Sequence, residues 1–257
     1  MTTPSFIGDW RVSEYLYTPA GEWAGVIHQR RLLRPQNDFI RVIQQCEPVQ
    51  EVAHLSAEGQ AVVALMNRRV GEFVFDLQVR GRGRHYLGPD VVGGGFAWGE
   101  GILTARGVWP GFGPNFTSFS ILIHPTRQIT GGKFLTAHTE LATLVGLAVP
   151  ATEEWPAFAG EPPASYQGEK WRIAPDGTLL ATEPYQTSGP VWPLGAGVRG
   201  NEKRYGAMRE WIGAAADGNT FSALAVADHT TQNLVALCHT YRDETLQQVE
   251  FYRLKGQ

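Results

Sequence analysis

The sequence contains little cysteine, few charged residues and no long apolar run. Its 257 residues include only two cysteines, Cys46 and Cys238, and no Cys-x-x-Cys pair. This scarcity favours two reduced thiols and argues against a disulfide framework or a zinc site. No apolar run approaches the ~20 residues of a membrane-spanning helix, and the opening MTTPSFIGDW lacks the charged and apolar regions of a signal peptide. We therefore expect a cytoplasmic protein without a membrane span.

The few charges are nearly balanced, with 22 Lys and Arg against 25 Asp and Glu and a formal net charge of −3. A mildly acidic chain without long basic runs is poorly suited to nucleic acid, so we expect no such partner. Residues 195–200 (GAGVRG) match the G-x-G-x-x-G motif, but Pro190 and Pro193 interrupt the strand that a dinucleotide site requires. We interpret this segment as a flexible glycine loop and predict no cofactor and no metal.

Glycine, proline and aromatic residues are abundant, with 30 glycines, 16 prolines and 11% aromatics. They punctuate short segments in which apolar and polar residues alternate, as in half-buried strands. Such strands are expected at residues 10–17, 26–33, 39–46, 72–80, 96–106, 119–124, 203–212, 221–228, 234–242 and 246–254. The sequence therefore predicts an all-β, mostly antiparallel fold, a closed or nearly closed barrel, because closure removes exposed strand edges.

One or two short helices are expected beside these strands. Within residues 137–149, Leu141, Leu144, Val145 and Ala148 recur at helical spacing, and Pro150 follows as a terminator. Residues 56–70 are ambiguous between a helix and a strand, and their apolar content favours a short helix.

The domain organisation has two interpretations. The first is a single barrel-type domain over residues 1–257, with an irregular proline-rich segment at 150–166. The second is two related halves, 1–149 and 167–257. Trp109 and Trp211 have the same separation as Phe119 and Phe221, and Gly8-Asp9-Trp10 has an echo in the segment from Gly168 to Trp171. Both an old duplication and convergence of aromatic-flanked hairpins explain these echoes.

The two ends of the chain resemble a known family. Gly8-Asp9-Trp10 opens the first predicted strand, and Arg253 lies in the last one. This resembles the calycin/lipocalin pattern, in which a Gly-x-Trp near the N-terminus seals the barrel floor and an arginine of the closing strand lies across the indole. The resemblance implies a lipocalin-like barrel with Trp10 as floor plug and Arg253 as its partner. It implies a fold and no particular activity.

Residues 93–133 hold the densest group of candidate site residues. In segment 96–106, Trp98, Glu100 and Arg106 share one face, and the opposite face is almost entirely small. If the large face points inward, Glu100 is a desolvated carboxyl group suited to proton transfer. If it points outward, Glu100 is an ordinary exposed residue.

Further candidates lie in loops and in the C-terminal hairpin. The loop at 107–115 is rich in glycine and aromatic residues and suits the rim of a ligand site. The turn at 124–128 offers polar anchors, and the last hairpin places a histidine and a tyrosine on one face, with a two-residue turn at Asp243-Glu244 that sets Gln248 opposite the histidine. The resulting candidates are Glu100, His124 and His239 for catalysis, and Trp98, Arg106, Trp109, Phe112, Arg127 and Tyr241 for ligand binding.

Three functions fit this pattern. The first is binding of a small hydrophobic or aromatic molecule in the barrel. The second is a cofactor-independent isomerase, cyclase, hydratase or lyase that uses a buried acid–base group in the same cavity. The third is a structural or oligomeric module with a barrel filled by side chains. A second copy of the chain, as in a homodimer, is also kept open as a partner.

Overall fold

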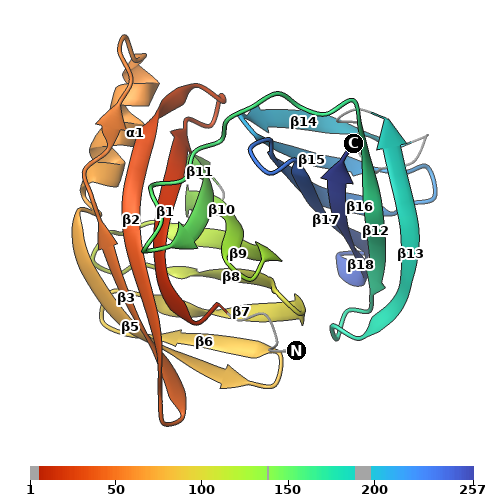
Figure 1. Ribbon diagram of the computed structural model, residues 1–257, viewed down its shortest axis with the longest axis horizontal. Helices are drawn as coiled ribbons and strands as arrows, with labels where there is room; N and C mark the ends of the chain where they lie inside the picture. Colours follow the sequence, from red (N-terminus) through yellow and green to blue (C-terminus); the bar gives the residue numbers. More distant parts are fainter. Residues whose placement is uncertain (1–5, 138, 189–197) are drawn as a thin grey trace. The chain divides into compact units, whose positions relative to one another are not determined.

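The computed structural model describes residues 6–137, 139–188 and 198–257 and divides the chain into two units. Unit 1 comprises Met1–Ala157 and unit 2 comprises Phe158–Gln257, so the division falls inside the proline-rich segment. The fold is all-β and antiparallel, as the sequence predicts. It contains a closed ten-stranded barrel in unit 1 and a second sheet in unit 2 (Figure 1).

Unit 1 is built from hairpin-connected strands. They are β1 (Gly8–Tyr17), β2 (Trp23–Gln36), β3 (Phe39–Cys46), β4 (Gln50–Glu51), β5 (Gly71–Arg80), β6 (Gly83–Leu87), β7 (Val92–Gly99), β8 (Ile102–Val108), β9 (Asn115–His124), β10 (Arg127–Thr136) and β11 (Thr139–Pro150). The first strand, β1, pairs with both β2 and β11, which closes the barrel. The short β4 pairs with the start of β2 outside this ring. Closure leaves no long unpaired edge in the barrel.

The helix α1 (Ala57–Asn67) confirms the prediction for residues 56–70 and runs beside β2 (Figure 1). It begins at Ser56, whose hydroxyl accepts a hydrogen bond from the Gly59 amide at 3.0 Å, an N-cap that satisfies one free helical donor. Val62, Val63 and Met66 are buried in the main apolar cluster of unit 1. The helix therefore contributes one side of the barrel core.

The register of the strands identifies the side chains that point into the barrel, because directly paired residues of antiparallel strands lie on one face. Leu16 of β1 is paired with Leu144 of β11, and both belong to the main apolar cluster. Val12 is paired with Ala148, and both belong to a smaller cluster around Trp10. The inward-facing residues of β1 therefore form two apolar layers with one position, residue 14, between them.

Other strands of the barrel also place inward-facing residues at the level of residue 14. Successive strand pairings connect one level of inward-facing residues, namely Glu14, Gly146, Thr130, Ser120, Leu103 and Ala97. The level is polar on β1, β9 and β10 and apolar on β7 and β8. Glycine suits position 146, because a Cβ atom there would lie 2.9 Å from the Ser13 carbonyl oxygen and 3.0 Å from the Glu14 Cγ, so that the backbone would have to shift.

The predicted helix at 137–149 is wrong, since this segment is strand β11. Both faces of β11 are buried, with Leu144 and Ala148 pointing inward and Val145 and Leu147 pointing outward. A strand buried on both faces loses the alternation of apolar and polar residues. Its apolar run then also satisfies helical spacing.

Two predicted single strands are hairpins. Segment 96–106 divides into β7 and β8 at a turn that contains Gly101, with φ +74°. Segment 203–212 divides between β14 and β15 near Gly206, with φ +56°. In both places a glycine adopts a left-handed conformation that other residues rarely take, and an isolated glycine in a strand pattern signals such a turn.

Unit 2 repeats part of the topology of unit 1. Its strands are β12 (Ser165–Ile173), β13 (Leu179–Ser188), β14 (Arg199–Tyr205), β15 (Met208–Ala214), β16 (Thr220–Asp228), β17 (Asn233–Arg242) and β18 (Thr245–Gly256). The first strand, β12, has β13 on one side and β18, β17, β16, β15 and β14 on the other. In unit 1, β1 has β2 on one side and β11, β10, β9, β8 and β7 on the other. The order of the strands is the same in the two units, and both duplication and convergence remain open as explanations.

Trp10 and Arg253, which the sequence predicts to form a pair, lie in different units and each has contacts within its own unit. Trp10 is 4% exposed and packs with Val12, Leu122 and other residues of unit 1, and its indole N–H donates to the Phe6 carbonyl at 3.0 Å. The Arg253 guanidinium carbon lies 5.0 Å from the ring centroid of Trp171. Trp171 stands on the first strand of unit 2 and Arg253 on its last. Arg253 thus lies over a tryptophan of its own unit, and its pairing with Trp10 stays a prediction.

The last hairpin turns at Asp243-Glu244, as predicted, and both residues have positive φ values of 48° and 62°. A bulge between Thr240 and Tyr241 shifts the register by one residue, so Gln248 pairs with Thr240 and not, as predicted, with His239.

We expect Glu244→Gly to stabilise the protein by about 0.5–1 kcal/mol, because a residue with a Cβ is strained at positive φ and this turn favours glycine. The free energy of unfolding in urea measures the effect. Glu202→Gly, in the interior of β14, should instead destabilise it. A Glu244→Gly variant no more stable than the wild type would contradict the strain argument.

Candidate functional site

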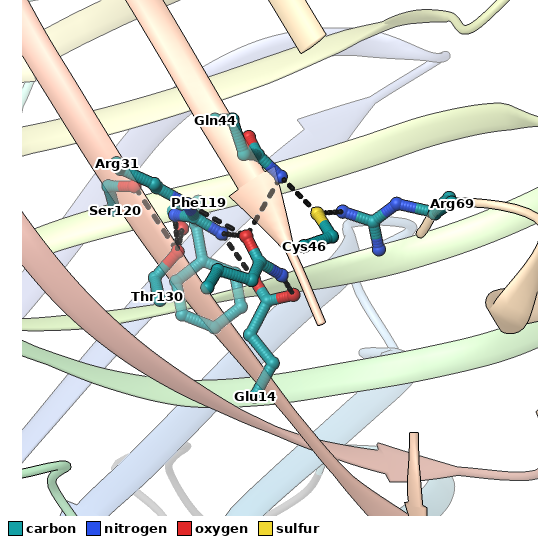
Figure 2. A network of polar contacts seen from close by, with 9 residues as sticks. Glu14, Arg31, Gln44, Cys46, Arg69, Phe119, Ser120 and Thr130 are labelled. Atoms are coloured by element: carbon teal, nitrogen blue, oxygen red, sulfur yellow. Dashed lines mark hydrogen bonds and ion pairs between the residues drawn. The ribbon is translucent and has the colours of Figure 1, made fainter. Parts of the chain in front are cut away.

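A buried polar network occupies the interior of the unit 1 barrel between the two apolar layers (Figure 2). At its centre, Arg31 Nη2 donates to Glu14 Oε1 at 2.5 Å. Gln29 Nε2 donates to the second carboxylate oxygen. The side chains of Glu14 and Arg31 are 5% and 20% exposed. The carboxylate thus has a partner for each oxygen in a largely desolvated position.

The network extends from this ion pair across neighbouring strands. Arg31 Nε donates to Gln29 Oε1 at 3.1 Å, and its Nη1 lies 3.3 Å from Thr130 Oγ1. Gln44 Nε2 donates to Gln29 Oε1 at 2.8 Å. The Thr130 hydroxyl donates to the Phe119 carbonyl at 3.2 Å. This part of the network satisfies its own members, as buried polar groups require.

The network ends at Cys46 and Arg69 (Figure 2). Gln44 Nε2 lies 3.4 Å and Arg69 Nη2 lies 3.9 Å from Cys46 Sγ. Arg69 is 3% exposed, and its guanidinium carbon is 4.7 Å and 4.9 Å from the ring centroids of Trp109 and Phe134. Its Nε and Nη1 are buried without a hydrogen-bond partner among the described residues. This guanidinium is the unsatisfied end of the network.

Aromatic rings surround the Arg69 end. Trp109 packs against Phe73, Phe112, Phe116 and Phe134 with centroid distances of 4.7, 6.4, 6.4 and 6.5 Å, all in edge-to-face arrangements. Such pairs contribute energy beyond their buried area. Trp109 and Phe112 both belong to this buried cluster of unit 1. The sequence predicted them as ligand-binding residues because of the composition of their loop.

The wall formed by β6, β7 and β8 is different. The inward-facing residues of β7 and β8 near the network are Gly95, Ala97, Leu103 and Ala105, which are all partly exposed. Tyr86 on β6 faces the same interior, and burial raises the pKa of its hydroxyl to about 12. Small, partly exposed residues therefore line the part of the barrel interior formed by β7 and β8.

The other candidates from segment 96–106 lie on the outer face. The Trp98 indole N–H donates to Thr104 Oγ1 at 2.8 Å, and Thr104 alternates with the inward-facing Leu103 and Ala105. Arg106 is exposed on the same outer face, and Glu100 is exposed in the turn between β7 and β8. The inward alternative for this face is therefore wrong, and the outward alternative holds.

The remaining candidates are dispersed. His124 is exposed at the end of β9, with its Nδ1 3.0 Å from Thr126 Oγ1, and Arg127 pairs with it at the start of β10. His239 and Tyr241 belong to unit 2, where their ring centroids are 6.3 Å apart. Burial lowers the pKa of His239 to about 4, partly offset by a hydrogen bond with the Ser222 backbone. The three predicted acid–base residues are thus divided between two units.

Sequence reasoning missed Glu14, Arg31 and Arg69. Glu14 had a usable signal, because it occupies an apolar position in the alternation of Trp10, Val12 and Leu16. A charged residue at such a position marks a buried ion pair or a site. Arg69 had no signal, since it follows a helix next to another arginine and only the fold shows that it is buried.

Among the described residues, no group of three or more histidine, cysteine, aspartate or glutamate side chains could hold a metal ion. No helix among them is long and apolar enough to cross a membrane.

Comparisons with known proteins support the fold. No protein-family model and no curated protein sequence matches the chain. The crystal structure of a protein of unknown function from the DUF3598 family of Nostoc punctiforme is similar, with a TM-score of 0.56 at 9% identity over 98% of this chain and 96% of that chain. Kievitone hydratase from Nectria haematococca aligns over 99% of this chain and 90% of its own at 9% identity, but its TM-score of 0.20 is too low to bear on fold or function. The first similarity concerns the fold alone.

Proposed function

We propose that unit 1 binds a small hydrophobic or aromatic molecule inside its barrel, in the manner of a lipocalin. The observation that carries the proposal is that two kinds of inward-facing surface adjoin in the barrel. One is the aromatic cluster around Trp109, and the other is the small, partly exposed surface that includes Ala97, Leu103 and Ala105. Ligand sites typically combine such apolar and aromatic walls with a few polar groups.

Catalysis has less support at this site. Both oxygens of Glu14 are occupied by Arg31 and Gln29, so this carboxylate is held as a structural ion pair. The predicted acids and bases of unit 1, Glu100 and His124, are exposed. A general acid or base has to be within reach of its substrate in a suitable protonation state. We therefore propose binding without turnover.

The test uses a neutral aromatic probe, 2-naphthamide, and two variants at neighbouring positions on opposite faces of β8. Ala105→Phe adds a ring to the inward face, and Arg106→Phe adds the same ring to the outer face. We expect the probe to quench tryptophan fluorescence of the wild type. Ala105→Phe should weaken binding at least ~10-fold by occupying the ligand's volume, whereas Arg106→Phe should retain it.

Circular dichroism controls for folding of both variants. A folded Ala105→Phe variant that binds the probe as well as the wild type would place the ligand elsewhere. Failure of the wild type to bind both 2-naphthamide and its carboxylate analogue, 2-naphthoate, would remove the proposed function itself.

A further inference from the structure

Within the described part of unit 1, the guanidinium of Arg69 contains buried nitrogens that lack a hydrogen-bond partner. Arg69 follows α1, where its backbone N–H donates to the Met66 carbonyl at 2.9 Å, and its side chain runs into the apolar cluster of unit 1. It is 3% exposed. None of the ion pairs among the described residues includes it. Arg69 is therefore a buried charge without a carboxylate partner.

The contacts that Arg69 makes compensate only part of this charge. Trp109 and Phe134 present ring faces to the cation at 4.7 and 4.9 Å, which is favourable but leaves its N–H groups unused. Cys46 Sγ, 3.9 Å from Nη2, is a weak acceptor at long range. Because arginine does not lose its proton in proteins, deprotonation cannot remove the energetic cost of this buried charge. The described residues therefore supply no hydrogen-bond acceptor for Nε and Nη1 of Arg69.

The neighbouring carboxylate is already committed. Glu14 accepts from Arg31 and Gln29, and the path from Glu14 to Arg69 runs through Gln29, Gln44 and Cys46 (Figure 2). The unit 1 interior thus holds one arginine neutralised by Glu14 and a second arginine that is not neutralised. One carboxylate would supply the charge partner that Arg69 lacks.

We propose that Arg69 binds the carboxylate of a small aromatic acid whose ring lies against the aromatic cluster around Trp109. The inference rests on the proposed binding function and specifies its ligand class. A carboxylate accepts two parallel hydrogen bonds from one edge of a guanidinium. Each such edge of Arg69 contains Nη2 together with Nε or Nη1, one of the two nitrogens without a partner. The aromatic residues provide the apolar surroundings that make this ion pair strong.

The experiment compares 2-naphthoate with 2-naphthamide, which has the same ring system and no charge. Binding is measured by calorimetry and by tryptophan quenching at pH 7. We expect the wild type to bind 2-naphthoate about 10- to 100-fold more tightly than 2-naphthamide, the range for a charge-assisted hydrogen bond. In Arg69→Met this preference should disappear with little change in 2-naphthamide affinity.

Arg68→Met is the matched control. Arg68 is the preceding residue and also an arginine near an aromatic ring, with its guanidinium carbon 5.8 Å from the Phe112 centroid, but it is exposed. This variant should retain the preference. The wild-type comparison needs no variant, so it holds even if Arg69→Met fails to fold.

Equal affinity of the wild type for the two probes would overturn the carboxylate proposal and leave the binding function standing. Retention of the preference in folded Arg69→Met would overturn the role of Arg69. No binding of either probe would overturn both proposals.

Discussion

Glu14→Ala should lower the free energy of unfolding by about 3–5 kcal/mol, the largest single effect expected in unit 1. The substitution removes the partner of Arg31 in a position where the carboxylate is 5% exposed. Breaking a buried pair leaves an uncompensated charge, and it also frees donors of Gln29 and Arg31. Urea unfolding followed by circular dichroism measures the loss.

The double variant Glu14→Leu/Arg31→Met separates the ion pair from the remaining packing. Replacing both partners by apolar residues of similar size should return the stability to within about 1 kcal/mol of the wild type or above it. Asp9→Ala is the matched control on the same two strands, because the Asp9–Arg30 pair is exposed and should contribute only about 0–1 kcal/mol. A loss for Glu14→Ala no greater than that for Asp9→Ala would show that the pair is not effectively buried.

Acidification should destabilise the protein through His239 by about 3 kcal/mol between pH 6.5 and pH 4. Burial lowers the pKa of the folded histidine from 6.5 to about 4. In this window the unfolded chain binds a proton that the folded chain does not, so stability falls as the pH falls. Above pH 6.5 both states hold a neutral imidazole and the full stability is present.

His239→Gln should remove this part of the pH dependence. The free energy of unfolding is measured in urea at pH 7 and pH 4 for the wild type and the variant. Between these two pH values the wild type should lose about 3 kcal/mol more than His239→Gln. His124→Gln is the control, because it replaces an exposed histidine, leaves His239 in place and should retain the pH dependence that His239 contributes. Parallel stability curves for the wild type and His239→Gln would mean that burial does not lower the pKa of His239 in the folded state.

The fold class was predictable because alternation is a direct consequence of strands with one buried face. Strand β3 was expected at its observed bounds, and α1 was expected from its apolar content. The failures have physical causes. Strand β11 is buried on both faces and shows no alternation, and the β7–β8 turn depends on the left-handed conformation of Gly101. Neither property is visible in apolar periodicity.

The site was less predictable than the fold because it depends on which face of each strand points inward. Trp109 and Phe112 were identified from composition, whereas Glu100 and Arg106 were chosen from a face that points outward. A shift of one residue exchanges the two faces of a strand. Arg69 could not be found in this way at all, since it lies outside the strands and gains its significance from Trp109 and Phe134, which are distant in sequence.

In each unit the first strand lies beside the last, with Trp10 opposite Pro150 in one and Tyr166 opposite Gly256 in the other. A short linker could therefore join the ends of unit 2, with new termini opened at the exposed turn Asp243-Glu244, and every strand would keep its neighbours. Circular permutants of this kind commonly fold when the original ends are close. The same proximity allows such a module to be duplicated in tandem within one gene, because each copy keeps the pairing between its own first and last strands.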